Sequence, residues 1–63
     1  SLSEEEKNIL NIIKQNNPSI LSDIKRKVGL SNKKWDKAIK KLVEKKIIKV
    51  TKIGEGIFIE LIE

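Results

Sequence analysis

Lysines recur at helical spacing within residues 31–51, the stretch SNKKWDKAIKKLVEKKIIKVT. Lys33, Lys37, Lys40 and Lys41 fall on one side of a helix over this stretch, because residues three and four apart are neighbours on a helix surface. The ammonium group of a lysine binds phosphate as a compact point charge. The pattern therefore predicts a surface that lies against a polyanion.

The other side of the same helix is apolar. Trp35, Ile39, Leu42 and Val43 recur at the spacing of a buried stripe. We therefore interpret Trp35 as a core residue rather than as a stacking platform for a single-stranded base. Two roles stay open for Phe58, which either covers the hairpin expected at the end of the chain or contacts a nucleic acid or a protein partner.

The charge is concentrated in the middle of the chain. The 63 residues carry a formal net charge of +5, made up of −1 over residues 1–18, +9 over residues 19–53 and −3 over residues 54–63. A basic middle between acidic ends predicts one polyanion-binding face. The alternative is a solvated surface in a lysine-rich composition of the kind that thermophiles favour.

The amino-acid composition excludes several kinds of functional site. The chain has no cysteine and no histidine, which leaves no disulfide, no thiolate metal site and no imidazole base. The carboxylates of residues 4–6 are explained by helix capping, so we expect no metal site there. We expect no cofactor and no small-molecule substrate either. We also expect no enzyme activity and no membrane span or signal peptide. Because the chain starts at Ser1, we interpret residues 1–63 as a single domain excised from a larger protein.

The pattern predicts a first helix over residues 4–15. Ser3 and Glu6 form a capping box, in which each side chain accepts from the backbone N–H of the other residue. The sequence Asn-Asn-Pro at residues 16–18 ends this helix. Ile20 and Leu21 follow as a short edge segment.

Two further helices are predicted next. Ser22 is the expected N-cap of a short helix over residues 22–28, and Gly29 closes that helix in a left-handed conformation. Ser31 is the expected N-cap of the third helix, which runs to residue 45 or 46.

A β-hairpin is predicted at the end of the chain. Residues 47–53 and 57–62 are rich in β-branched residues and flank Gly-Glu-Gly at positions 54–56. Pairing Ile53 with Phe58 places one group of apolar side chains on the buried face, namely Ile48, Val50, Ile59 and Leu61.

This order gives an α+β fold, a three-helix bundle with a C-terminal β-hairpin wing. Over its whole length the chain resembles the winged-helix (winged helix-turn-helix) family, on the motifs at residues 23–31, 38–48 and 54–56. It is most similar to archaeal-type and eukaryotic winged helices of transcription and DNA replication, such as RNA polymerase III 34-kDa-type subunits, TFE-beta and MCM helicase C-terminal domains.

The resemblance implies that the third helix enters the major groove of duplex DNA and that the wing lies along the backbone. The DNA-binding residues that it implies are Asn32, Lys33, Lys37, Lys40, Lys41, Lys49, Lys52, Lys25 and Lys27. Lysine binds phosphate without reading bases, and only Asn32 suits a bidentate contact with adenine. We therefore expect phosphate-dominated, weakly sequence-selective binding.

The function expected from this reasoning is that of a DNA-binding module of a transcription or replication protein in the cytoplasm (nucleoid) or nucleus. The alternative is a protein–protein docking domain within a larger complex, since winged helices also bind proteins. Ile53, Phe58 and Ile62 are the apolar residues that would serve a protein partner. A continuous lysine patch favours the first hypothesis, and an apolar groove favours the second.

Overall fold

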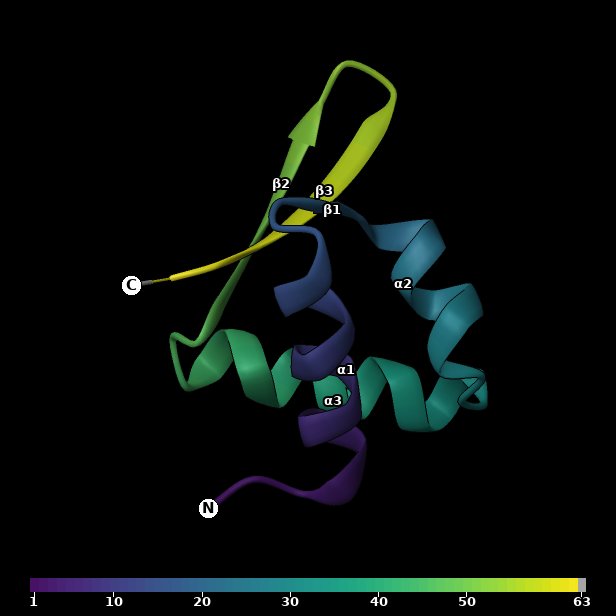
Figure 1. Ribbon diagram of the computed structural model, residues 1–63, viewed down its shortest axis with the longest axis vertical. Coiled ribbons are helices and arrows are strands. Elements are labelled where there is room, and N and C mark those ends of the chain that lie inside the picture. Colours follow the sequence, from purple (N-terminus) through teal and green to yellow (C-terminus); the bar gives the residue numbers. More distant parts are fainter. Residues whose placement is uncertain (63) are drawn as a thin grey trace.

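The computed structural model describes residues 1–62 and has the α+β architecture expected from the sequence. Three helices and three strands follow one another as α1 (Glu4–Gln15), β1 (Ser19–Ile20), α2 (Leu21–Val28), α3 (Asn32–Glu44), β2 (Ile48–Ile53) and β3 (Gly56–Leu61). In Figure 1, α1 crosses in front of α3, α2 lies to one side, and the β2–β3 hairpin projects away from the helices. None of the helices in residues 1–62 is long and apolar enough to cross a membrane.

The sheet is antiparallel, with the strand order β1-β3-β2. β3 is the central strand and pairs with β2 from Ile48↔Leu61 to Ile53↔Gly56. β1 adds only two residues on the other side of β3. β2 is an outer strand over its full length, because β3 is the only strand with which it pairs within residues 1–62.

The hairpin turn is tighter than the sequence suggested. Ile53 lies opposite Gly56 rather than Phe58, because only Gly54 and Glu55 make the turn. Gly54 has φ 60°, and glycine at the first of two turn positions is typical of a type II′ turn. The predicted pairing of the two strands is therefore wrong by two positions.

An error of two positions keeps every side chain on its predicted face, because side chains alternate along a strand. Ile48 and Ile59 are buried on that face, as expected, and Leu61 is partly buried. Val50 shares the face but is 39% exposed. Its predicted burial is wrong because β2 is the outer strand of the sheet, whereas Ile59, directly opposite Val50 on the central strand β3, is fully covered.

The core lies between the three helices and the base of the sheet. Its members come from every element except β1, and they are Ile9, Leu10, Ile13, Ile24, Trp35, Ala38, Leu42, Ile48 and Ile59. Trp35 is only 3% exposed, which confirms its interpretation as a core residue.

Two of the three predicted helix starts are confirmed. Ser3 and Glu6 form the capping box, with both backbone-to-side-chain hydrogen bonds at 3.1 Å. Ser31 caps α3, since its hydroxyl accepts from the N–H of Lys34 at 3.3 Å. The prediction for α2 is wrong: Ser22 lies inside the helix, and the N-cap is Ile20, which makes no side-chain capping bond.

The physical reason is that Ile20 already pairs with β3 in an extended conformation, so α2 starts directly after the strand. At the other end of α2, Gly29 has φ 66° and closes the helix as predicted. Its backbone N–H donates to the carbonyl of Lys25.

The end of α3 contains the only non-glycine residue with positive φ among residues 1–62, Lys46 at φ 61°. The N–H of Lys46 donates to the carbonyl of Val43 at 2.9 Å, and the N–H of Ile47 donates to the carbonyl of Leu42 at 3.0 Å. These two bonds close the helix at a position where glycine is the usual residue.

We expect Lys46→Gly to raise the free energy of unfolding by about 0.5–1 kcal/mol. The left-handed conformation costs roughly 1–2 kcal/mol for a residue with a Cβ, and the greater flexibility of unfolded glycine offsets part of that gain. Urea denaturation measures the difference. The matched control is Glu44→Gly, because Glu44 is exposed and is the last residue inside α3, so that its replacement by glycine is expected to destabilise. Equal losses for both variants would contradict this account of Lys46.

Candidate nucleic-acid interface

The exposed surface of α3 has one row that consists only of lysines. Lys33, Lys37 and Lys41 are four residues apart, and all three side chains are exposed. We call these three residues the lysine row. None of them has an ion-pair partner within the described chain, residues 1–62. A helix rises about 1.5 Å per residue, so the row spans roughly 12 Å along α3.

The neighbouring row on α3 has mixed charge. Asp36, Lys40 and Glu44 are also four residues apart and exposed. Lys40 therefore lies between two carboxylates on the same helix face, where residues four apart are close neighbours. These carboxylates repel a polyanion, so Lys40 is less suited to phosphate than the members of the lysine row.

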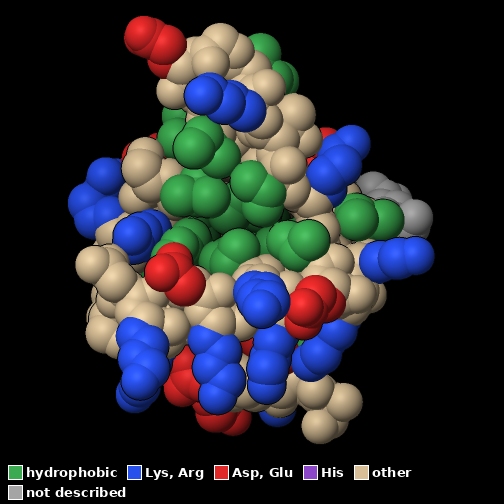
Figure 2. All heavy atoms as spheres, turned by 180° about the vertical axis from the view of Figure 1, so that it is seen from behind, with side chains coloured by type: hydrophobic (Ala, Val, Ile, Leu, Met, Phe, Trp, Pro, Cys, Tyr) green, Lys and Arg blue, Asp and Glu red, His purple; other side chains and the backbone are tan. Residues whose placement is uncertain are grey.

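Beyond the mixed row, the surface towards the hairpin is apolar. Figure 2 shows this apolar area between the hairpin above and a fringe of Lys and Arg side chains below, at the level of α3. The apolar side chains of α3 outside the core include Ile39, which is half-buried, and Val43, which is 42% exposed. On the hairpin, Val50 and Ile57 share the sheet face that carries the core, and Ile57 is 41% exposed.

The remaining sequence-predicted DNA-binding residues lie apart from the lysine row. Lys49 and Lys52 are on β2, where they point to opposite faces of the sheet because their positions differ by an odd number. Lys49 is paired with Glu60 at 3.2 Å. Lys25 and Lys27 are on α2, and Lys25 is half-buried.

Asn32 is the first residue of α3 and is exposed. The structure thus brings together Lys33, Lys37 and Lys41 in one row and sets Lys40 beside it between two carboxylates. Apart from Asn32, the other predicted residues are distributed over α2 and the hairpin.

Sequence reasoning missed Lys34. This exposed residue helps to line a shallow depression between α3 and the start of α1, together with Lys37 and Lys41 of the lysine row. The signal was present in the sequence, since Lys34 and Lys41 are seven residues apart, two helical turns. The other side of the depression has Glu5 and Glu6, so it is not a purely cationic pocket.

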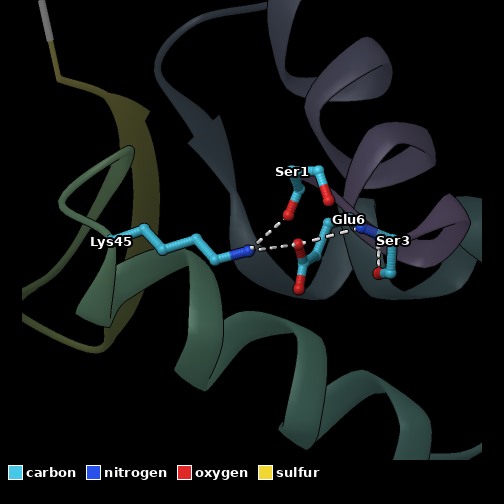
Figure 3. A network of polar contacts seen from close by, with 4 residues as sticks. All are labelled: Ser1, Ser3, Glu6 and Lys45. Carbon is cyan, nitrogen blue, oxygen red and sulfur yellow. Dashed lines mark hydrogen bonds and ion pairs between the residues drawn. The ribbon is translucent and has the colours of Figure 1, made fainter.

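Glu6 is the second feature that the sequence did not reveal in full. Its side chain is 2% exposed, and one carboxylate oxygen accepts from Lys45 Nζ at 2.9 Å and from the N–H of Ser3 at 3.1 Å. Lys45 Nζ also donates to the carbonyl of Ser1 at 3.1 Å. Figure 3 shows Lys45 reaching from the end of α3 to the start of α1. The ion pair thereby ties Glu6, in the first turn of α1, to Lys45 at the C-terminal end of α3.

The hydrogen bond from Lys45 lowers the pKa of Glu6 below its ordinary value of 4.5. Burial opposes this shift, and the backbone N–H of Ser3 and the positive charges of Lys45 and Lys41 reinforce it. A carboxyl group whose pKa is lower in the folded state stabilises the fold above its ordinary pKa. That contribution is lost as the pH falls through the lowered pKa.

We therefore expect the free energy of unfolding to fall as the pH is taken from about 5 to 2, with part of the loss due to Glu6. Urea denaturation across this range measures it. In Glu6→Gln the pH dependence is expected to be shallower, because the amide does not titrate. Glu5→Gln, one residue away and outside the ion pair, serves as the control. An unchanged slope in Glu6→Gln would contradict the assignment.

Nothing in the described part of the chain gathers three or more His, Cys, Asp or Glu side chains into a possible metal site. Glu6 is already engaged by Lys45 and Ser3. The chemistry that α3 offers at its surface is electrostatic binding of an anion by several exposed ammonium groups.

Comparison with known proteins gives one informative relative. No family model matches the chain, and no solved structure matches it. The lysine--tRNA ligase of Christiangramia forsetii (strain DSM 17595 / CGMCC 1.15422 / KT0803) is 54% identical to it over 54 residues, which is 86% of this chain and 10% of the ligase. The chain therefore spans about a tenth of the length of this curated relative.

This match corrects the functional expectation. A DNA-binding module of a transcription or replication protein was expected from the helix order and the lysines, and that prediction is wrong, because the similarity is to a segment of an aminoacyl-tRNA synthetase. Lysines that bind phosphate are equally suited to DNA and RNA, so the residues themselves could not separate the two.

Proposed function

We propose that this chain is an accessory domain of a lysine--tRNA ligase-type protein and that it binds tRNA through the lysine row of α3. The observation that carries the proposal is the 54% identity over 54 residues with a lysine--tRNA ligase, a protein whose name states that it acts on tRNA. The exposed, unpaired lysines supply the means of contact.

The domain's task in this proposal is binding rather than catalysis. The segment corresponds to about a tenth of the matched ligase, and the chemistry of α3 is that of phosphate contact. Additional contacts with the tRNA backbone raise the affinity of the polypeptide that carries the domain, since linked binding sites act at a high effective concentration.

We also propose that the fold belongs to the winged-helix class. Support comes from the order of three helices followed by an antiparallel hairpin, with a two-residue strand between the first two helices. In this assignment α3 is the helix that contacts nucleic acid. Its contact face is shifted away from the hairpin, because the surface towards the hairpin is apolar and bordered by Asp36 and Glu44.

An NMR titration of the 63-residue chain with tRNA tests the proposal. At about 50 mM salt we expect binding with a Kd in the range of roughly 1–100 µM, typical of contacts made through phosphates alone. The amides of residues 33–41 should shift most, and those of the hairpin tip least. Absence of binding at 100 µM tRNA, or shifts confined to the hairpin, would refute the proposed function.

A further inference from the structure

We propose that the lysine row recognises double-helical RNA rather than unpaired nucleotides, and that it does not distinguish one tRNA from another. This inference rests on the proposed function and specifies the part of the tRNA that the domain contacts. It follows from which side chains are absent around the lysine row and from the rigidity of α3.

Unpaired nucleotides are recognised mainly by stacking on exposed aromatic rings. The chain has two aromatic residues, Trp35 and Phe58, and no tyrosine or histidine. Trp35 is 3% exposed and belongs to the core. Phe58 is half-buried. It lies on the face of the sheet opposite to that of the buried Ile59, and this face points away from the helices. Neither ring is available beside the lysine row as a platform for a base.

Specific reading of bases in a duplex depends mainly on side chains that make two hydrogen bonds to one base, such as arginine and asparagine. The single arginine, Arg26, is on α2 and is bound to Asp23 at 3.1 Å. Asn32 is the one amide on α3, at its first residue. The major groove of A-form RNA is also too narrow for a helix to enter. The side chains of α3 are thus limited to contacts with the backbone, which is the same in every stem.

The spacing of the charges favours a fixed array of phosphates. α3 is capped at its start by Ser31, and Trp35, Ala38 and Leu42 anchor it in the core. Its ammonium groups are therefore attached to a rigid rod at intervals of about 6 Å. A stem presents phosphates in a regular order, whereas a flexible single strand must lose conformational entropy to match the same rod.

Fluorescence titrations of the 63-residue chain test this inference with four probes at one salt concentration. Two are an RNA hairpin with a fully paired stem and an unstructured RNA with the same number of phosphates. The others are tRNA(Lys) and a tRNA for a different amino acid. At 0.1 M salt we expect the hairpin to bind roughly fourfold more tightly than the unstructured strand, because each of three phosphate contacts releases about 0.9 counterion from a duplex and about 0.7 from a single strand. No exposed aromatic ring beside the lysine row offsets this difference by stacking on unpaired bases.

The two tRNAs are expected to bind within about threefold of each other, because one specific base contact would already separate them further. Equal or tighter binding of the unstructured strand, or a tenfold preference for tRNA(Lys), would overturn this inference but leave tRNA binding intact. Absence of binding to all four probes would instead overturn the proposed function itself.

Discussion

Replacing Trp35 with alanine is expected to remove the cooperative unfolding transition of the domain at 25 °C. Trp35 is 3% exposed and packs in the middle of the core. Truncation of a buried tryptophan costs about 3–5 kcal/mol. A domain of this size has a total stability of roughly 3–9 kcal/mol, so the loss is comparable with the whole.

Circular dichroism during urea and thermal denaturation measures this effect. Trp35→Phe is the control, because the smaller ring keeps part of the packing and should leave a folded domain with a lower midpoint. The phenylalanine variant should also bind RNA as the parent does. A Trp35→Ala variant that stays fully folded and loses only RNA binding would show that the indole is a ligand contact instead of a core residue.

Removing the lysine row is expected to abolish most RNA binding without affecting the fold. In the triple variant Lys33→Gln, Lys37→Gln, Lys41→Gln, three phosphate contacts are lost. Each contact contributes roughly 0.9 to the slope of log K against log salt, by the coefficient for duplex DNA. The slope should become shallower by roughly 2.7, and the affinity at 0.1 M salt should fall roughly 500-fold.

A matched control separates this local effect from the change in net charge. Lys7→Gln, Lys14→Gln, Lys46→Gln removes the same charge from exposed positions outside the lysine row, and we expect a much smaller loss of affinity. The unfolding midpoints of both variants should stay near that of the parent, because all six side chains are exposed. Equal losses in the two triple variants would indicate attraction by overall charge and contradict a defined contact face.

The local signals in the sequence were sufficient for most of the fold. The capping box of Ser3 and Glu6 set the start of α1, and Gly29 and Ser31 marked the turn between α2 and α3. These motifs act through backbone groups within three or four residues, so their effect can be read without knowing the tertiary structure. The hairpin faces were also predicted correctly, because they depend only on alternation.

Non-local features were out of reach. The start of α2 depends on the pairing of Ile20 with Phe58, which is 38 positions further along the chain. The contact between Glu6 and Lys45 likewise joins residues 39 positions apart. The division of the candidate interface was within reach, because Asp36, Lys40 and Glu44 follow the same spacing of four residues as the lysine row. Sequence reasoning considered the lysines alone and therefore grouped Lys40 with them.

The position of β2 at the margin of the sheet gives Lys49 and Lys52 a role that needs no ligand. One side of this strand has backbone groups without a partner strand in the sheet, and such margins tend to recruit strands from other molecules. Ile53, which is 64% exposed, would add to that tendency. Lys52 has no ion-pair partner among residues 1–62, and its charge repels a second copy of the same strand, whereas Lys49 contributes less because it is paired with Glu60. A charged margin of this kind disfavours aggregation through strand pairing.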